Sequence, residues 1–497
     1  MNMLSYLLDG FSVAFIPTNL LMALFGSFFG TIVGMIPGIG PVQGIAILTP
    51  LMFALGIPPE AALILFAAIY FGAEYGNAVS AILLNIPGTS ASIVTTFDGY
   101  PMAKSGRGGT ALAISAIASF IASSISLLLM MFFALIISDW AIHFGPAEYF
   151  VLMVFAFSML STLSGDNIVK GLISSIFGLM LATVGLDLQT GIPRFTFGIM
   201  KLYDGFNFIV VTIGFFAISE VLLTLENTEI SKSLKRPINR VMVSFKEFCF
   251  SIFTIIRSSV VGFIIGVLPG AGGTIATFVS YTIEKRICHK KNNFGDGDIR
   301  GVASPQAANS SAVGGALIPM LVLGLPGSET TAVMLAALMG MNITPGPLMI
   351  ENHPEIFWGL VASMFIANIL LLILNLPLVR FIVKILLVPK SILMPLIVGI
   401  SCIAVYTVNY NIFDIFLMTI FGLIGYLMRK QNFPLAPVIL GLVLGPIIET
   451  NLSRALLISG GDIKIFFSSS IAIFLWILTI ISIVFPFVAK KLRKYSI

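Results

Sequence analysis

The chain has 497 residues, of which 58% are hydrophobic and only 10% are charged, and its formal net charge is +5. Soluble proteins carry about 25% charged residues, so this composition excludes a soluble globular protein. Apolar runs of about 20 residues, long enough to cross a bilayer, recur to the end of the chain. We therefore expect an all-α polytopic protein embedded in a lipid bilayer.

Signatures of enzymes, metal centres and nucleic-acid binding are missing. No GxxxxGK[ST] loop occurs, which excludes ATP hydrolysis by that route. The basic residues form short clusters between apolar runs, as cytoplasmic loops do, so we expect no nucleic-acid partner. The cysteines and histidines have no spacing typical of metal ligands or disulfides: Cys249, Cys288, Cys402, His143, His289 and His353. We expect no enzyme activity and no bound cofactor.

The first motif along the chain is a glycine-rich stretch inside an apolar run, GTIVGMIPGIG at 30–40. It lacks the βαβ setting of a dinucleotide-binding loop. For Gly30 and Gly34 we favour close helix packing through small residues. Gly38 and Gly40, which follow Pro37, are assigned to a substrate site.

The next long segment, from Ala61 to Phe97, is interrupted by LLNIPGTSAS at 83–92. Proline removes an amide donor and glycine frees the backbone, so a helix should break here. About 37 residues are too many for one span and too few for two with a loop. We expect a re-entrant hairpin or a broken helix. Glu74 and Asn77 precede the break, although Glu74 is equally compatible with a short loop.

Both features recur in the second half of the chain. GFIIGVLPGAG at 262–272 repeats the glycine spacing at an offset of 232, and LGLPGSETTA at 323–332 repeats the break at an offset of 239. We predict two structural repeats, 1–225 and 247–497, joined by a basic cytoplasmic linker at 226–246. Gln306, Asn309 and Ser310 precede the second break.

The charges of matching loops indicate that the repeats are inverted. Lys104 and Arg107 follow the first break, whereas Glu351 and Glu355 follow the second. Lys and Arg favour the cytoplasmic side, so matching loops should face opposite sides. On this count the N-terminus is periplasmic and the C-terminus cytoplasmic, while Arg194 falls on a loop that we place outside.

Irregular backbone in a membrane must be buried in protein or line a wet cavity. A helix that restarts after such a break exposes amides and the positive end of its dipole, which suits a carboxylate. Interrupted segments at matching places in inverted repeats are typical of a transporter's central site. Ordinary helix capping by the same hydroxyl groups is compatible with that role. The predicted substrate-binding residues are Gly38, Gly40, Asn85, Pro87, Gly88, Thr89, Ser90, Ser92, Asn309, Pro326, Gly327, Ser328, Thr330 and Thr331.

A cation site is expected beside the breaks, because carbonyl groups freed there can bind Na⁺. We assign it to Asn85, Gly324 and Glu329. An ionisable residue inside the membrane is a functional candidate by default. Glu329 is equally compatible with a salt bridge.

Two stretches carry a family resemblance: ILLNIPGTSASIVTTFDGYPMAKSGRGG and GVASPQAANSSAVGGALIPMLVLGLPGSETTAVMLAALMGMNITPGPLM. They resemble the signature regions of the large membrane subunit of tripartite tricarboxylate transporters (TctA family), and the likeness covers nearly the whole chain. The family pattern has Glu at 306 and Ala at 329, where this chain has Gln306 and Glu329. One negative charge is therefore moved, so the resemblance fixes neither the ion coupling nor the substrate.

The resemblance implies secondary uptake of di- or tricarboxylates, or related organic acids, across the bacterial inner membrane, coupled to Na⁺ or H⁺. It also implies two partners, a periplasmic solute-binding protein and a small four-helix membrane subunit. The alternative is a stand-alone transporter of organic anions or amino acids that needs no binding protein. A passive channel would need a continuous polar lining, and an intramembrane enzyme would need paired catalytic groups; neither pattern is found.

Overall fold

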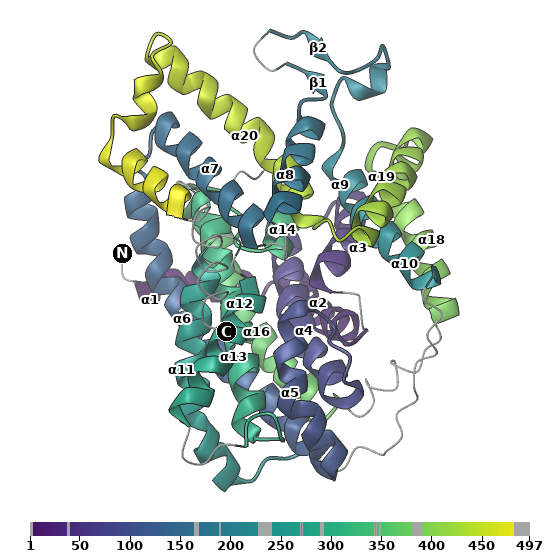
Figure 1. Ribbon diagram of the computed structural model, residues 1–497, viewed down its shortest axis with the longest axis vertical. Helices are drawn as coiled ribbons and strands as arrows, with labels where there is room; N and C mark the ends of the chain where they lie inside the picture. The colour runs from purple at the N-terminus through teal and green to yellow at the C-terminus, as the bar shows by residue number, and fades with distance from the viewer. Residues whose placement is uncertain are drawn as a thin grey trace, which may run out of the picture. The chain divides into compact units, whose positions relative to one another are not determined.

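In the computed structural model, the chain folds mainly into helices (Figure 1). The structure describes residues 3–36, 40–163, 168–187, 190–226, 241–268, 270, 272–288, 293–341, 343, 345–346, 349–379 and 390–481. The contacts define two compact units, each of which draws on both predicted repeats: unit 1 is Met1–Ser138 with Glu220–Asn411, and unit 2 is Asp139–Ser219 with Ile412–Ile497. A structural repeat need not coincide with a compact unit, so the predicted boundaries at 225 and 247 stay predictions.

Unit 1 holds the helices that surround the two predicted breaks. From the first half of the chain it takes α1 (Met3–Ala14), α2 (Pro17–Met35), α3 (Pro41–Ala54), α4 (Pro59–Leu84), η1 (Ser90–Ser92), α5 (Ile93–Met102), η2 (Ala103–Arg107) and most of α6 (Gly108–Ala141). From the second half it takes α11 (Phe245–Val267), α12 (Gly272–Ile287), α13 (Ile299–Ile318), η6 (Pro319–Leu323), α14 (Glu329–Gly340), α15 (Met349–Asn352), α16 (Pro354–Asn375) and α18 (Lys390–Asn409). Residues 227–240 of the predicted linker lie outside the described residues, and Lys246 belongs to α11.

Unit 2 is a smaller group of helices with one short hairpin. It contains α7 (Pro146–Leu163), α8 (Ile168–Ala182), β1 (Gly185–Leu186), β2 (Pro193–Arg194), η3 (Met200–Leu202), α9 (Phe208–Thr212), η4 (Ile213–Ile218), α19 (Ile412–Lys430), α20 (Ala436–Ile458) and η8 (Ile463–Phe467). The helix α10 (Ser219–Glu226) begins at the boundary between the units. β1 pairs antiparallel with β2, with Gly185 opposite Arg194. Arg194 also bonds Glu449 of α20, at 2.8 Å.

In unit 1, α2 packs closely along α4 because α2 carries glycines on the shared face. A side-chain carbon at Gly30 would stand 2.5 Å from the Ile69 carbonyl oxygen, and one at Gly34 would stand 2.1 Å from that of Ala73. No carbon atom fits at these distances, so only glycine permits this approach. Small residues are the usual means of close helix contact in membranes.

The same contact recurs between α11 and α13, which lie side by side (Figure 1). A side-chain carbon at Gly262 would stand 2.3 Å from the Ala308 carbonyl oxygen, and one at Gly266 would stand 2.4 Å from that of Ala312. Ala308 and Ala312 lie 239 positions after Ile69 and Ala73. The packing role predicted for Gly30 and Gly34 is therefore confirmed, and Gly262 and Gly266 make equivalent contacts in the second half of the chain.

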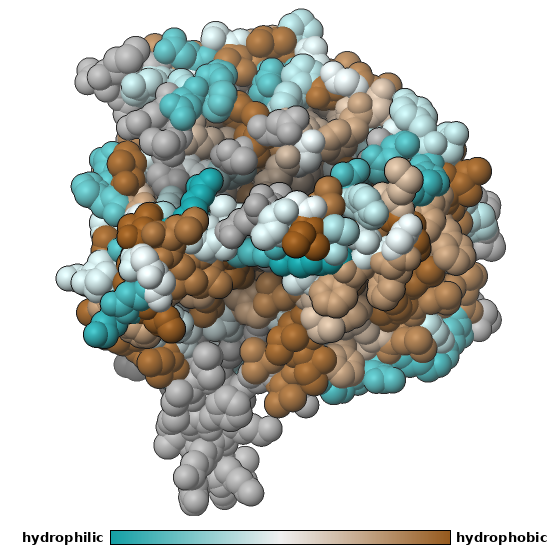
Figure 2. Space-filling view, turned by 90° about the horizontal axis from the view of Figure 1, so that it is seen from above, coloured by the Kyte–Doolittle hydropathy of each residue, from teal (hydrophilic) through white to brown (hydrophobic). Residues whose placement is uncertain are grey.

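The helices are those of a multi-pass membrane protein. Among the described residues, nine helices are long and apolar enough to cross a bilayer. Figure 2 shows broad hydrophobic areas on the face that it presents, separated by hydrophilic ones, and many large apolar side chains are exposed, such as Phe132, Ile264 and Phe416. Such exposure suits contact with lipid. By contrast, α4 is buried along its whole apolar stretch and α13 along nearly all of it.

Candidate functional site

The first predicted break lies between α4 and η1. Asn85 ends α4 in the left-handed conformation, with φ 57° and ψ 30°, which asparagine tolerates better than most residues. After Pro87 and Gly88 the helix restarts at Ser90, directly after Thr89. The Thr89 amide donates to Ser92 Oγ at 3.3 Å, and Ser92 Oγ donates to the Thr89 carbonyl at 2.9 Å. The chain therefore stops and restarts its helix within five residues.

The second break has the same construction. Gly324 ends η6 with φ 68°, and Ser328 caps α14. The Ser328 amide donates to Thr331 Oγ1 at 2.7 Å, and the Thr331 amide donates to Ser328 Oγ at 3.2 Å. Gly324, Ser328 and Thr331 follow Asn85, Thr89 and Ser92 by 239 positions each. The alternative of ordinary capping is therefore seen for Ser328 at the second break, whereas the Thr89 hydroxyl at the first break accepts from no amide of its own helix. The substrate role of these residues stays a prediction.

Glycine is required within both breaks for steric reasons. A side-chain carbon at Gly88 would stand 2.6 Å from Asn77 Cβ and 2.7 Å from the Gly34 carbonyl oxygen. One at Gly327 would stand 2.7 Å from the Ala316 carbonyl oxygen. Each break is therefore folded tightly against the helix that precedes it.

Each glycine-rich motif also adjoins the break of its own half. A side-chain carbon at Gly40 would contact Thr89 Cγ2 at 3.2 Å, so the start of α3 faces the first break. The Gly270 amide donates to the Gly327 carbonyl at 3.0 Å. The structure thus brings Gly40 to the first predicted group, whereas Gly38 lies outside the described residues.

One face of α4 links the two breaks. Tyr70, Glu74 and Asn77 follow one another at spacings of four and three residues, so they share this face. The Tyr70 hydroxyl lies 3.0 Å from Ser328 Oγ at the second break. Asn77 Nδ2 donates to Thr89 Oγ1 at 2.9 Å, at the first break, and to Glu74 Oε2 at 2.8 Å. These three residues therefore form a buried polar stripe between the breaks.

The helix α13 completes this stripe from the other half. Asn309 Nδ2 donates to Glu74 Oε2 at 2.6 Å, and Gln306 Nε2 donates to the Glu74 carbonyl at 2.9 Å. A side-chain carbon at Gly273, in the first turn of α12, would stand 2.2 Å from Asn309 Oδ1. Glu74 is therefore inside the protein and contacts both halves, so the alternative of a loop position was wrong.

The remaining predicted site residues differ in how far they are exposed to solvent. Ser90 is exposed, and its hydroxyl lies 2.7 Å from Thr274 Oγ1 of α12. Pro326 and Thr330 are buried at the second break, whereas Pro87 is partly buried at the first. Of the predicted cation ligands, Gly324 is buried but Asn85 and Glu329 are exposed. The cation role of those three residues stays a prediction.

Sequence reasoning missed Tyr70 as a site residue. An aromatic residue in a long apolar run gives no local signal of function. The signal was available in the repeat, because Tyr70 and Asn309 are 239 positions apart. Both side chains reach a polar group in the other half.

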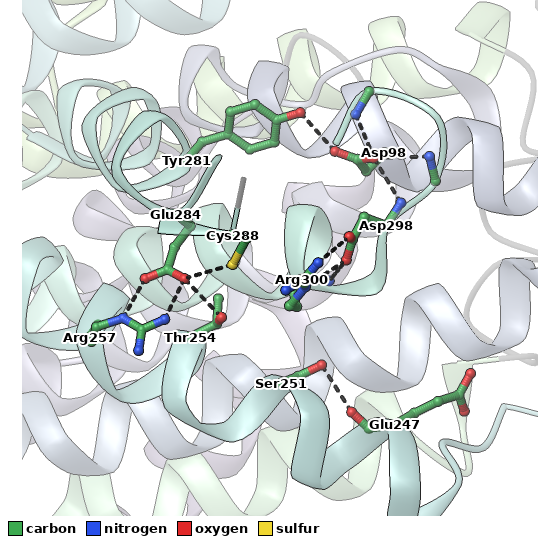
Figure 3. A network of polar contacts seen from close by, with 12 residues as sticks. Asp98, Glu247, Ser251, Thr254, Arg257, Tyr281, Glu284, Cys288, Asp298 and Arg300 are labelled. Carbon is green, nitrogen blue, oxygen red and sulfur yellow. Dashed lines mark hydrogen bonds and ion pairs between the residues drawn. The ribbon is translucent and has the colours of Figure 1, made fainter. Parts of the chain in front are cut away.

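A second polar network, also missed, joins α5 to the loop before α13 (Figure 3). Asp98 Oδ1 accepts from the amides of Gly295, Gly297 and Asp298 at 2.8 to 2.9 Å, and Asp98 Oδ2 accepts from the Tyr281 hydroxyl at 2.8 Å. Three amides that converge on one carboxylate form an anion-binding nest. The network holds a loop of the second half against a helix of the first.

Next to it, Glu284 is buried in α12 and pairs with Arg257 of α11, with Arg257 Nη2 2.7 Å from Glu284 Oε2. Thr254 Oγ1 donates to the same oxygen at 2.9 Å. Burial raises the pKa of the neighbouring Cys288 thiol, so the thiol stays protonated at neutral pH. Its distance of 3.9 Å from Glu284 fits a weak S–H donor. The charges of Glu284 and Arg257 compensate each other, so we assign this cluster a structural role.

Comparison with known proteins gives one family and two relatives. The model of the tripartite tricarboxylate transporter TctA family matches residues 20–440. An uncharacterized 52.8 kDa protein of Agrobacterium vitis, from the TAR-I ttuC' 3' region, is 41% identical over 95% of this chain and 94% of its own length. An uncharacterized protein from the TAR-II ttuC' 3' region of the same organism is 43% identical over 42% of this chain and 87% of its own length. No solved structure matches.

Proposed function

The chain belongs to the tripartite tricarboxylate transporter TctA family, and from this membership we propose that it is the membrane permease subunit of a secondary transporter. The proposed activity is uptake of di- or tricarboxylates, or related organic acids, by symport with Na⁺ or H⁺. The proposed partners are a periplasmic solute-binding protein and a small four-helix membrane subunit. The proposed location is the bacterial inner membrane, with the N-terminus periplasmic and the C-terminus cytoplasmic.

The observation that carries this proposal is the paired break. Two helices stop at left-handed residues and restart at turns closed by hydroxyl groups, 239 positions apart, and Tyr70 and Asn77 of α4 connect the two. Broken helices at corresponding places in two repeats are the usual setting of a transporter's substrate site. Inversion of the repeats would place both sites near the middle of the bilayer.

Substrate recognition is proposed at the restarted helices. The amides of Thr89, Ser328 and Thr331 are already bonded to neighbouring hydroxyl groups, so the proposed donors are the hydroxyl groups themselves. The helix dipole favours negative charge at the same place. The hydroxyl groups of Thr89 and Ser328 are held in place by Asn77 and Tyr70, so they present a fixed geometry to the substrate. Two such sites suit a substrate with two or more carboxylates. Pre-placed donors lower the cost of ordering a site when a ligand binds.

The experiment is uptake of labelled citrate, and of a panel of other carboxylates, into proteoliposomes that contain this chain and its small partner. A Na⁺ or H⁺ gradient and the purified binding protein are added or omitted in turn. We expect uptake above the equilibrium level only when both a cation gradient and the binding protein are present.

Other outcomes would overturn parts of the proposal. Gradient-driven uptake without the binding protein would support the stand-alone transporter. Flux that only equilibrates the substrate, whatever the gradient, would support a passive channel. Absence of carboxylate uptake under all conditions would remove the proposed substrate class.

A further inference from the structure

We propose that Glu74, Asn77, Thr89 and Asn309 form a sodium-binding site between the two breaks. The role of this ion as the coupling ion of the transport cycle rests on the proposed function. It replaces the sequence-based placement at Asn85, Gly324 and Glu329, two of which are exposed.

The first argument is the charge of Glu74. Its side chain is 6% exposed, and a carboxylate taken out of water needs a counter-charge. The elements that pack against α4 include α2, α3, η1, α5, α6, α13, α14 and α16. Within their described ranges they carry one basic residue, Arg300, which is bonded to Asp298 at 2.7 Å. The neighbours of Glu74 thus supply no positive charge, and a bound cation would.

The second argument is an oxygen atom left without a partner. Asn77 is fully buried, and both protons of its amide nitrogen are used, one by Glu74 and one by Thr89. Because a carboxylate only accepts, this orientation of the amide is fixed. Asn77 Oδ1 then has no hydrogen-bond partner among the described residues. A buried acceptor without a partner is unfavourable, unless a cation binds there.

Further oxygen atoms belong to the same hydrogen-bonded group of residues. Glu74 Oε2 accepts from Asn77 and Asn309, whereas no donor to Glu74 Oε1 is found among the described residues. Thr89 Oγ1 accepts from Asn77, and Asn309 Oδ1 faces the first turn of α12, where only glycine fits. One carboxylate with neutral oxygen ligands suits a monovalent ion. Sites for Ca²⁺ usually contain several carboxylates. The described residues contain no group of three or more acidic, histidine or cysteine side chains that could hold a metal ion, so this site does not suit Ca²⁺.

The third argument comes from the repeat. Positions 74 and 77 correspond to Val313 and Ala316 in the second half. The second break is folded as tightly as the first although these two positions are apolar, because Gly327 packs on Ala316 as Gly88 packs on Asn77. The packing therefore does not need a carboxylate or an amide here. The polar pair is present in one half only, which indicates a function other than folding.

A cation here would couple the ion to the substrate. Asn77 joins Glu74 to Thr89, the residue directly before the first restarted helix. An unneutralised Glu74 would repel a substrate carboxylate bound at that helix. A sodium ion bound first removes this repulsion and fixes the cap, so the two ligands favour each other's binding.

The test is a direct binding measurement on the purified, intact chain without substrate, with ²²Na⁺ as the probe. We expect saturable binding that falls at least about tenfold in Glu74→Gln and less steeply in Asn77→Ala, the residue that the second half carries at this position. Glu60→Gln, at the start of the same helix, is the matched control and should bind like the wild type. Thermal melting in NaCl against choline chloride provides a second readout, because a ligand that binds the folded state raises the Tm.

The outcomes separate this site from the proposed function. Unchanged ²²Na⁺ binding in Glu74→Gln, or loss in Glu329→Gln alone, would overturn the site in favour of the sequence-based one. A wild-type chain that binds no ²²Na⁺ but is stabilised by acidification through Glu74 would replace sodium with a proton. Intact ²²Na⁺ binding combined with no carboxylate uptake would leave the site standing and remove the proposed substrate.

Discussion

Tyr70 shows how one side chain can join two distant parts of the sequence. Its ring is buried in α4, and its hydroxyl lies 3.0 Å from the hydroxyl group that caps α14. Asn309, 239 positions later, reaches back from α13 to Glu74. The two residues make reciprocal contacts of different chemistry, so each half supplies a buried polar contact to the other.

Tyr70→Phe should weaken transport without disturbing the fold. The ring remains and one hydrogen bond is lost, which is worth about 0.5–1.5 kcal/mol, so the KM for the carboxylate should rise roughly 2- to 10-fold. The measurement is the concentration dependence of initial uptake. Tyr75→Phe is the control: its hydroxyl bonds Asn368 at 2.8 Å, away from both breaks. Equal effects of the two substitutions would contradict the assignment.

For single residues, the sequence predicted where the helices break, but it did not predict which residues contact the breaks. Proline and glycine mark where a helix stops, and the hydroxyl residues after them mark where it restarts; the structure agrees at Thr89 and Ser328. The partners of Glu74 were not predictable in the same way. A helix that is buried on all sides has no apolar stripe to show which face a residue occupies, so only the repeat offset linked positions 70 and 309.

The helix breaks act as elements that must stay tightly folded. Gly88→Val and Gly327→Val each place side-chain atoms where the preceding helix already lies, at 2.6 to 2.7 Å for the first carbon alone. We expect uptake to fall at least about tenfold in each variant, because misplacing a binding group by 1 Å is costly. Abundance in the membrane fraction should stay near that of the wild type.

The matched control for these variants is Gly399→Val in α18, where a side-chain carbon would have nothing within 4 Å. It should transport normally. Normal uptake by both break variants would show that the substrate does not bind at the restarted helices.

Asp98 should stabilise the contact between α5 and the loop before α13. Asp98→Ala leaves three amides without their acceptor, at a cost of about 1–3 kcal/mol each if they stay buried, so the Tm should fall clearly. Asp98→Asn keeps one acceptor oxygen and should cost less. Arg107→Ala, which removes the exposed ion pair with Glu247, is worth about 0–1 kcal/mol and serves as control. Thermal melting in detergent decides; equal Tm values for all three variants would contradict the role of Asp98.

For the whole molecule, the inversion of the repeats is the main prediction that still needs a test. Ser105 in η2 and Glu355 in the first turn of α16 are both exposed, and they follow the first and second breaks at the places predicted to match. In a chain whose native cysteines are replaced, Ser105→Cys should react with a membrane-impermeant maleimide only in inside-out vesicles. Glu355→Cys should react in intact cells. Labelling of both from the same side would show parallel repeats.

The burial of α4 and α13 has a consequence for how the protein is made. Both helices carry polar residues that lipid does not contact in the finished structure. During synthesis, however, about 215 residues separate the end of α4 from the start of α13, which takes roughly 10–40 s at 5–20 residues per second. For that interval Glu74 is in the membrane without Asn309 and Gln306. Either α2 and α3 shield the nascent helix, or the insertion machinery retains it until the second half arrives.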